Sequence, residues 1–576
     1  MLHILKKLGW YLKKEKYNYL LMLFLLLLIS IVSLTPAYVF GKAIDIITYK
    51  ELTRNKLILL VLLLILIPLF RYCLSFIYNY LINKQAQKLA YTLREKYLKH
   101  LFKMDLEFYE KYEKGELISI VTQDLENITI AATSLLEGIV FNFGVIIFAI
   151  TIMSTTISLK LTLISVLIMP VGLTILNIIR NNKRKYVKIH REIYGRMTTK
   201  VLESTEGQKT IRAYVQEEND LKKLNKAIMD DINSWRYIVN YENWFNPLFE
   251  VIYGISYVLA FVFGVYFIIN QELTVGGLIT FVSYISQLYS PIISLSTIFS
   301  QINNATIAVD KYFNILKEEP KVKDEINSKD ILDFEKIEYK DVYFKYPFDK
   351  EPVIKGISFE LKNGETLGIV GPTGSGKSTI IRQLLREFNI TKGSILIDGK
   401  DIKEYKIEDI RNLVGYVPQE HILFRKKVDD NILLGNPNAN IKELNKAIKM
   451  ADFEKDLLFL NDGLNTMVGE SGSTLSGGQK QRLSIARALI KNPKILILDD
   501  SLSAVDANTE NNIINELKNN RKNMTNIIIA HRFSAVRDAN MILVINDGKI
   551  VQRGTHEQLL KEDGWYKEQY IKQMMK

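Results

Sequence analysis

The stretch Gly371-Pro-Thr-Gly-Ser-Gly-Lys-Ser378 decides the fold of the second half of the chain. It matches the P-loop pattern GxxxxGK[ST], and it lies between a predicted strand, 366–370, and a predicted helix, 379–388. Its glycines allow backbone N–H groups to surround phosphates, the helix N-terminus favours an anion, and Lys377 adds a positive charge. The hydroxyl of Ser378 is expected to bind Mg²⁺. The sequence therefore predicts a nucleotide-binding α/β domain.

Two further motifs follow the P-loop. Ile495-Leu-Ile-Leu-Asp499 is typical of a strand buried on both faces, and the carboxylate at its end would reach the metal. Leu475-Ser-Gly-Gly-Gln479 precedes a predicted helix, 480–490, and small residues at a helix N-terminus form an anion site. An ordinary glycine-rich helix start would explain this piece alone. Its position between the two other motifs favours a second phosphate site.

Six apolar runs occupy the first 300 of the 576 residues. A helix needs about 20 apolar residues to span a membrane, and each run is long enough. The sequence therefore predicts six transmembrane helices, at residues 17–40, 57–82, 135–157, 159–180, 247–270 and 276–300.

The net charge of +12 comes largely from the segments that flank these spans. Lys and Arg are abundant between spans 2 and 3 and between spans 4 and 5, and they are scarce in the turns after spans 3 and 5. By the positive-inside rule, both long segments and both termini are cytoplasmic. Motifs of nucleic-acid binding are absent from the sequence, so we expect a bilayer and no nucleic acid as partner. The single cysteine, Cys73, excludes a disulfide within the chain.

The two long cytoplasmic segments contain almost no Gly or Pro. This composition predicts that the membrane helices continue far beyond the bilayer, at about 1.5 Å per residue. Their tips, near 105–114 and 206–214, are then the parts that a soluble domain can reach.

Span 6 carries polar residues along one helical face, which fits either the wall of a translocation cavity or hydrogen bonding between packed helices. We favour the cavity, because six polar residues on one stripe exceed what packing usually needs. Arg71 and Glu250 lie at membrane depth, where an ionisable group is a functional candidate, although a structural ion pair is equally compatible. The stripe consists of Ser283, Gln287, Ser290, Ser294, Thr297 and Gln301.

These observations define the fold class and the domains. We expect a multidomain membrane protein, with an all-α six-helix transmembrane domain and long cytoplasmic helical extensions at residues 1–316. A polar linker follows at 317–335, and an α/β P-loop NTPase domain occupies 336–576.

The order of these motifs, completed by Ser503-Ala-Val-Asp506, resembles an ATP-binding cassette (ABC) transporter. Six spans ahead of one cassette resemble the exporter half-transporters, and the similarity covers essentially the whole chain, including 108–124 and 274–291. The resemblance implies that the two cytoplasmic tips are coupling helices. It also implies that each ATP lies between the P-loop of one cassette and Ser476–Gln479 of another, so the chain must dimerise.

The resemblance assigns a role to each matching residue. His531 could be an ordinary loop histidine, but its position one strand after Asp499 favours the switch that contacts the γ-phosphate. Catalytic roles go to Asp500, His531 and Gln419, and Mg²⁺ ligation to Ser378, Gln419 and Asp499. ATP binding goes to Tyr346, which stacks on adenine, and to Gly371, Pro372, Thr373, Gly374, Ser375, Gly376, Lys377, Ser378, Thr379, Ser476, Gly477, Gly478, Gln479 and Asp506.

One position departs from the family pattern. A glutamate usually follows the Asp of the second strand motif and activates the attacking water, whereas here Asp500 follows Asp499. Its side chain is one methylene shorter, and a misplacement of about 1 Å can lower a rate on the order of 10²-fold. We therefore expect slow hydrolysis at this site. The combination of Asp500 with an intact Leu475–Gln479 motif resembles the degenerate-site subunit of heterodimeric bacterial multidrug exporters, in which the partner subunit carries Glu. A homodimer that tolerates Asp is the alternative.

The resemblance implies ATP-driven export of amphiphilic small molecules across the cytoplasmic membrane by alternating access. The alternatives are a homodimeric exporter of lipid or peptide and an ATP-dependent sensor that transports nothing. The direction of transport also rests on the resemblance, because importers exist on the same scaffold.

Overall fold

The computed structural model describes residues 2–469, 472, 474–503, 506–520 and 524–575. The chain divides into two compact units. We call Met1–Lys99 with Gly115–Lys317 the helical unit, and His100–Lys114 with Glu318–Lys576 the α/β unit. Residues 100–114, the tip of the long segment between predicted spans 2 and 3, therefore belong to the nucleotide-binding half of the protein.

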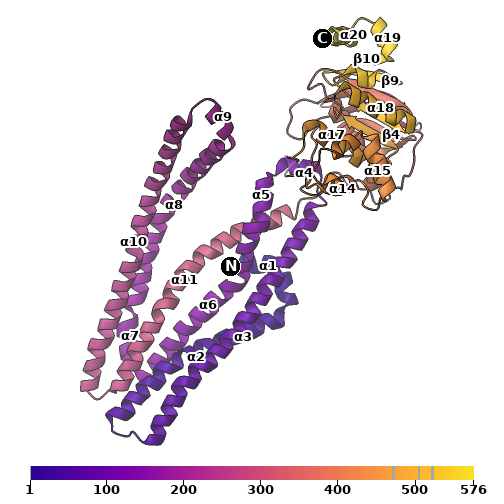
Figure 1. Ribbon diagram of the computed structural model, residues 1–576. Coiled ribbons are helices and arrows are strands. Elements are labelled where there is room, and N and C mark those ends of the chain that lie inside the picture. The colour runs from indigo at the N-terminus through magenta and orange to yellow at the C-terminus, as the bar shows by residue number, and fades with distance from the viewer. Residues whose placement is uncertain (1, 470–471, 473, 504–505, 521–523, 576) are drawn as a thin grey trace. The chain divides into compact units, whose positions relative to one another are not determined.

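Long helices joined by short turns build the helical unit (Figure 1). In chain order they are α1 (Leu2–Lys14), α2 (Lys16–Thr48), α3 (Arg54–Leu101), α5 (Lys114–Ser119), α6 (Leu125–Ile152), α7 (Leu159–Val166), α8 (Ile168–Glu206), α9 (Gln208–Ala213), α10 (Glu217–Ile269) and α11 (Val275–Ile315), with π-helical turns at Ile120–Asp124 and Met153–Ile157.

Among the described residues, five helical stretches are long and apolar enough to cross a membrane. They contain predicted spans 1, 2 and 3, span 5 except for Asn270, and most of span 6. The fourth span, 159–180, is also helical, but its apolar stretch is the shorter Leu159–Gly172. It is divided at Leu167, between α7 and α8. Pro170 explains the break, because a proline has no N–H to bond the carbonyl four residues earlier and its ring clashes with that carbonyl.

Small and polar residues join the membrane helices. The Ser256 hydroxyl donates to the carbonyl of Ser165 at 2.6 Å, which links α10 to α7. The Asp45 carboxylate of α2 accepts from the Thr274 hydroxyl at 3.0 Å and from the Gly276 N–H at 2.8 Å, at the start of α11. Such contacts replace the hydrophobic driving force that lipid tails remove.

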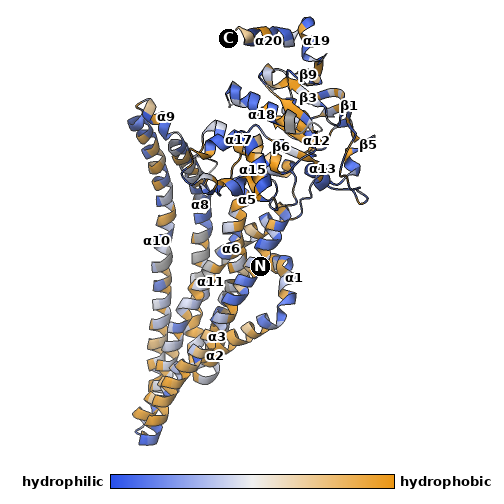
Figure 2. Cartoon of the chain, turned by 45° about the vertical axis from the view of Figure 1, so that its right-hand side comes forward, coloured by the Kyte–Doolittle hydropathy of each residue, from blue (hydrophilic) through white to orange (hydrophobic). Residues whose placement is uncertain are grey.

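The predicted helical extensions are confirmed: α3 runs to Leu101, α8 to Glu206, and α10 begins at Glu217. Figure 2 shows that α8 and α10 become more polar towards α9. The sequence did not lead us to predict α1, whose buried Ile4, Leu8 and Tyr11 lie on one helical face.

The α/β unit contains two sheets. A six-stranded sheet has the order β10-β9-β3-β8-β7-β6, with β10 antiparallel and the others parallel, and a four-stranded antiparallel sheet has the order β2-β1-β4-β5. The strands are β1 (Lys336–Phe344), β2 (Ile354–Lys362), β3 (Thr366–Val370), β4 (Lys392–Ile397), β5 (Lys400–Asp401), β6 (Val414–Val417), β7 (Ile495–Asp499), β8 (Thr525–Ile529), β9 (Met541–Asn546) and β10 (Lys549–Gly554).

Helices cover the six-stranded sheet, and its two faces belong to two different hydrophobic cores. Along β7, Ile495 and Ile497 belong to one core and Leu496 and Leu498 to the other, as expected where successive side chains point to opposite faces. The helices are α4 (Leu106–Lys111), α12 (Lys377–Leu384), α13 (Ile407–Leu413), α14 (Val428–Leu433), α15 (Ile441–Met450), α16 (Glu454–Leu457), α17 (Gly477–Ile490), α18 (Ala507–Asn520), α19 (His556–Lys561) and α20 (Trp565–Met574).

Candidate nucleotide site

The P-loop connects the buried strand β3 to α12 through a turn that requires glycine. Gly371 has φ of +149° and Gly376 has φ of +97°, a range that side chains rarely allow. A Cβ atom on Gly371 would lie 2.0 Å from the carbonyl oxygen of Ile545. The backbone can therefore turn tightly at the N-terminus of α12, where a phosphate is favoured.

Lys377 and Ser375 fit a phosphate ligand. The Lys377 ammonium donates to the carbonyls of Gly371, at 3.0 Å, and Pro372, at 2.8 Å, across the loop. Burial lowers the pKa of Lys377, while Asp500 and Asp499 oppose that shift. The Ser375 hydroxyl is buried and has no hydrogen-bond partner in the described part of the chain. A phosphate oxygen would satisfy this group.

Asp499 and Ser378 meet as the sequence predicts. The Ser378 hydroxyl donates to Asp499 Oδ1 at 2.8 Å, and the Tyr416 hydroxyl donates to Oδ2 at 3.3 Å. Burial raises the pKa of Asp499, and these hydrogen bonds oppose it. A hydroxyl and a carboxylate are the oxygen ligands that Mg²⁺ prefers. Gln419 is exposed just beyond β6, the strand that pairs with β7.

Asp500 and His531 lie at the ends of the neighbouring strands β7 and β8. The Asp500 N–H donates to the carbonyl of Ile529 at 2.9 Å, and the Ser503 hydroxyl donates to the carbonyl of Asp500 at 2.9 Å. Burial raises the pKa of Asp500, and the charges of His531 and Lys377 partly offset this. The structure therefore brings a carboxylate, an imidazole and the P-loop lysine to one edge of the sheet.

Tyr346 lies beside the P-loop helix. Its hydroxyl and that of Thr379 are 3.1 Å apart, and Arg382 donates to it at 3.2 Å. Its ring meets those of Phe344 and Phe388 edge to face, at centroid distances of 4.8 and 5.3 Å. The stacking of Tyr346 on adenine stays a prediction.

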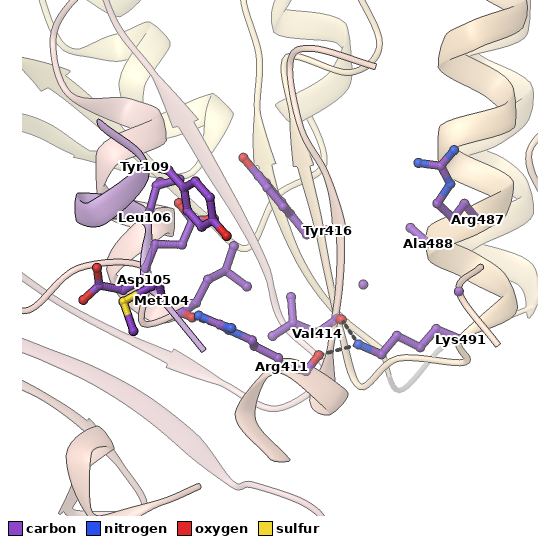
Figure 3. Close-up of a pocket in the computed structure, with 14 residues that line it drawn as sticks. Met104, Asp105, Leu106, Tyr109, Arg411, Val414, Tyr416, Arg487, Ala488 and Lys491 are labelled. Carbon is purple, nitrogen blue, oxygen red and sulfur yellow. Dashed lines mark hydrogen bonds between the residues drawn. The ribbon is translucent and has the colours of Figure 1, made fainter. Parts of the chain in front are cut away.

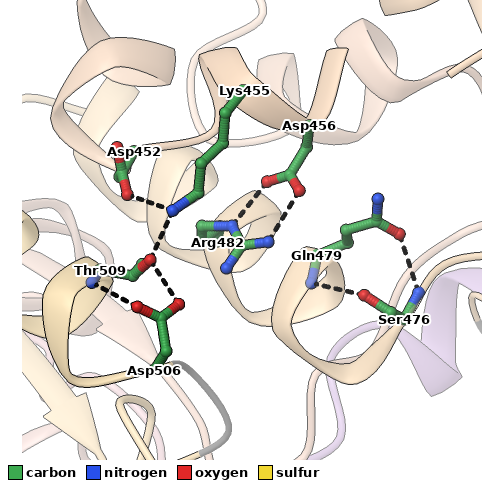
Figure 4. Close-up of polar contacts among 8 residues, drawn as sticks. All are labelled: Asp452, Lys455, Asp456, Ser476, Gln479, Arg482, Asp506 and Thr509. Atoms are coloured by element: carbon green, nitrogen blue, oxygen red, sulfur yellow. Dashed lines mark hydrogen bonds and ion pairs between the residues drawn. The ribbon is translucent and has the colours of Figure 1, made fainter. Parts of the chain in front are cut away.

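The predicted second phosphate site is the N-terminus of α17. Ser476 and Gln479 form a capping box, in which the Gln479 N–H donates to the Ser476 hydroxyl at 3.3 Å and the Ser476 N–H to the Gln479 side chain at 2.9 Å (Figure 4). In the described hydrogen bonds each side chain accepts from the backbone N–H of the other residue, and none of these bonds reaches the P-loop. Gly477 and Gly478 begin the helix between them.

Asp506 acts as a helix cap in this chain. Its carboxylate accepts from the N–H and hydroxyl of Thr509, at 3.0 and 2.7 Å, and these bonds lower its pKa to about 2. The Lys455 ammonium joins Thr509 to Asp452, as Figure 4 shows. Ala504 and Val505 of the same motif lie outside the described residues.

Sequence reasoning missed Tyr416 and the groove that it lines. Figure 3 shows this cavity of about 530 Å³ beside α4 in the α/β unit. Asp105 holds α4, because its carboxylate accepts from the N–H groups of Phe108, at 3.1 Å, and Val322, at 3.0 Å. Tyr416 belongs to an apolar strand and gave no signal of its own. The lining includes Met104, Leu106, Tyr109, Arg411, Tyr416 and Arg487.

Comparisons with known proteins agree with this arrangement. Residues 19–292 match the family model of the ABC transporter transmembrane region, and residues 354–503 match that of the ABC transporter. The chain is 37% identical to a Bacillus subtilis (strain 168) protein described as a probable multidrug resistance ABC transporter ATP-binding/permease protein, YheI, over 100% of this chain and 98% of that protein.

Two further similarities extend over nearly all of the chain. The multidrug resistance-like ATP-binding protein MdlA of Escherichia coli (strain K12) is 32% identical, over 100% of this chain and 97% of that protein. A solved structure of a bacterial Atm1-family ABC exporter with ATP bound superposes with a TM-score of 0.84 at 27% identity, covering 97% of this chain and 99% of the other.

Proposed function

We propose that this chain exports amphiphilic small molecules, drugs among them. The premise is that the chain belongs to the ABC transporter family. It is an exporter-type half-transporter, which joins a membrane region to one ATP-binding cassette. It is a multi-pass membrane protein with a cytoplasmic cassette, and it is an ATPase coupled to transport. Relatives described by multidrug resistance, YheI and MdlA, support the substrate class.

The residues at the sheet edge hold ATP and Mg²⁺. The P-loop N–H groups and Lys377 bind the phosphates, and Ser378, Asp499 and Gln419 hold the metal, which neutralises phosphate charge when bound. Two observations support this assignment: the Ser378–Asp499 contact, and the Ser375 hydroxyl, which has no hydrogen-bond partner among the described residues. His531 contacts the γ-phosphate, and Asp500 orients the attacking water.

The functional unit is a dimer. The N-terminus of α17 carries the second phosphate site, and among the described residues its capping pair, Ser476 and Gln479, bonds to itself and not to this chain's P-loop. A second cassette brings its own P-loop to this helix, so each nucleotide lies between two subunits. The exposed tip that follows α9, with Tyr214 73% and Val215 80% exposed, supplies an apolar contact for the groove of the other subunit.

The chain's own P-loop site hydrolyses ATP slowly. Asp500 occupies the position of the base beside Asp499, and its carboxylate stops about 1 Å short of where a glutamate would reach. This single observation supports a heterodimer in which a distinct partner carries Glu and the α17 helix of this chain completes the competent site. Transport then alternates between inward and outward states, because ATP binds the closed pair of cassettes more tightly.

The test compares the chain alone, the assembled complex and an Asp500→Glu variant of that complex. We expect little ATPase activity from the chain alone, and turnover at its P-loop to rise roughly 10²-fold with Asp500→Glu if reach is the defect. Asp500→Asn is the matched control, since it keeps the size and removes the base. Brisk, substrate-stimulated hydrolysis by the unaltered chain alone would reject the heterodimer.

A further inference from the structure

Tyr346 lies in the loop between β1 and β2, outside the hydrogen-bond ladder of either strand. β1 ends at Phe344, and β2 begins at Ile354. The carbonyl of Tyr346 accepts from the N–H of Asp349 at 3.2 Å, which closes a turn within the loop and ties it to no strand. The Tyr346 side chain is only half-buried. Its orientation therefore depends on the contacts of the side chain itself.

Two side chains of α12 reach the phenol of Tyr346. The Tyr346 hydroxyl lies 3.1 Å from the hydroxyl of Thr379, and Arg382 Nη1 donates to it at 3.2 Å. Thr379 and Arg382 are three residues apart on one helix, so they share a helical face. The same helix begins at Lys377, the lysine of the P-loop. The ring that is expected to stack on the base is thus tied to the helix that is expected to hold the phosphates.

Arg382 is itself held in place. Its Nε donates to Glu387 Oε2 at 2.9 Å, and the two side chains are 31% and 24% exposed. The guanidinium carbon lies 5.5 Å from the centroid of the Phe388 ring and 6.0 Å from that of Tyr346. A planar guanidinium that a carboxylate fixes at one nitrogen has a set direction for its other N–H groups. One of these groups points at the Tyr346 hydroxyl.

These contacts order the Tyr346 ring before a nucleotide arrives. Phe344 and Phe388 meet the ring edge to face, and the hydroxyl is held at the rim of the ring, which leaves a face on which a base can stack. A loop without these contacts would have to be ordered during binding, and that ordering costs affinity. A ring tied to α12 also has a set separation from the P-loop, which a nucleotide must match to use both.

We propose that Arg382 is a positioning residue of the nucleotide site. It holds the Tyr346 ring at a set distance from the P-loop, so that the site recognises a nucleoside triphosphate by its base as well as by its phosphates. This inference rests on the ATP site proposed above and adds the residue that sets the dependence on the base. Arg382 acts through Tyr346 and needs no contact of its own with the nucleotide.

The test is equilibrium binding to the full chain in lipid nanodiscs, with two probes that share a chain of three phosphates. AMP-PNP is a non-hydrolysable ATP analogue, and inorganic tripolyphosphate has no base. We expect Arg382→Met to weaken binding of AMP-PNP about fivefold, the cost of ordering one side chain on binding, and to leave tripolyphosphate unchanged. An unchanged affinity for tripolyphosphate also shows that the P-loop of the variant is folded.

Lys392→Met is the matched control. The Lys392 ammonium lies 5.0 Å from the ring centroid of a different tyrosine, Tyr343, and pairs with Asp341 at 3.3 Å. Its loss removes a positive charge beside an aromatic ring and should alter the binding of neither probe.

A second variant separates positioning from direct contact with the nucleotide. Tyr346→Phe keeps the aromatic face and removes the hydroxyl that Arg382 and Thr379 hold, so it should also weaken AMP-PNP about fivefold. Arg382→Met should then cause no further loss, because both changes remove one interaction. Losses that multiply in the double variant would overturn the role of Arg382 through Tyr346. An unchanged affinity of Arg382→Met for AMP-PNP, or an equal loss of both probes, would overturn it too.

Lys377→Ala separates this inference from the site on which it rests. Lys377 is expected to bind phosphate, so its loss should weaken the binding of both probes. If it weakens neither, the proposed ATP site is rejected, and the role of Arg382 is rejected with it. If it weakens both while Arg382→Met leaves AMP-PNP unchanged, the ATP site stands and the positioning role is rejected.

Discussion

The Arg482 guanidinium and the Asp456 carboxylate form a two-pronged ion pair that is almost excluded from solvent. The distances are 2.6 Å from Nε and 2.7 Å from Nη2, and the two side chains are 9% and 6% exposed. The pair fixes α17, whose first turn is the proposed phosphate site, to α16. Loss of one member leaves the other charge buried and unpaired.

Arg482→Ala should therefore lower the free energy of unfolding of the α/β unit by about 3–5 kcal/mol. The measurement is the thermal unfolding midpoint of the full chain, which should fall by about 10 °C. A double variant, Arg482→Met with Asp456→Leu, should recover most of the loss. Lys567→Ala breaks an exposed pair with Asp563 and should cost less than about 1 kcal/mol. Equal unfolding midpoints for Arg482→Ala and Lys567→Ala would contradict a special contribution of the buried pair.

Single residues of the nucleotide site were predictable where a strand end fixes them. Ser378 and Asp499 meet at 2.8 Å because β3 and β7 are parallel strands of one sheet and their carboxyl ends share an edge. The Tyr416 hydroxyl and the Arg482–Asp456 pair were not predictable. Both depend on side-chain orientation between segments far apart in the sequence, about which hydropathy patterns carry no information.

Among the elements, α4 depends on one side chain for its start and for its attachment. Asp105 caps the helix through the Phe108 N–H, and its other oxygen accepts from the N–H groups of Lys321 and Val322. Asp105→Ala should remove about 1–3 kcal/mol of local stability and reduce the amount of substrate moved per ATP hydrolysed. Vesicle uptake measured together with ATP hydrolysis gives that ratio.

Asn440→Ala is the matched control for Asp105→Ala. Asn440 caps α15 in a capping box with Glu443, and it does not line the groove beside α4. It should cost about 1 kcal/mol and leave the coupling ratio unchanged. The attachment of α4 would have no role in coupling if both variants behaved alike.

The contact between α19 and α20 should depend on pH through His556. Its Nδ1 lies 2.7 Å from the Tyr566 hydroxyl, and burial lowers the pKa of His556 below its usual value of about 6.5. The folded state therefore favours the neutral imidazole. Stability from this contact is complete above about pH 6.5 and decreases as pH falls towards the lowered folded-state pKa.

Hydrogen exchange in α20, corrected for intrinsic rates, should accordingly show less protection at pH 5.5 than at pH 7.5. His556→Gln cannot titrate, and it should abolish that difference while reducing protection at both values. The same pH dependence in His556→Gln would assign the effect to another group.

The lengths of the apolar runs predicted the spans, and the scarcity of Gly and Pro predicted their helical extensions, because both features can be read directly from the sequence. The break at Leu167 was missed, since Pro170 lies inside an apolar run that reads as one helix. The tip near 105–114 was expected to be within reach of a soluble domain, but its inclusion in the α/β unit itself was not predicted. It results from tertiary contacts of Asp105 and Leu106 that local sequence does not encode.

For the assembled pair of subunits, the proposed asymmetry predicts unequal effects of two variants in this chain. A Cβ atom on Gly477 has no neighbour within 4 Å, so Gly477→Asp should fold normally and place a negative charge against the partner's nucleotide. It should lower steady-state ATP hydrolysis about 10²-fold. Lys377→Ala disables only the slow site and should cost far less. Equal losses would indicate two equivalent sites.

The α/β unit combines two separate parts of the chain, His100–Lys114 and Glu318–Lys576, and this has a consequence for its synthesis. Helix α4 lies more than 200 residues before Val322, the linker residue whose N–H donates to the Asp105 carboxylate. Leu106 packs on a core that extends to Ile545. At 5–20 residues per second, α4 waits on the order of 20–90 s after leaving the ribosome before that surface exists. A cassette expressed from residue 318 onward would lack α4. The apolar surface against which Leu106 packs would then be exposed to water.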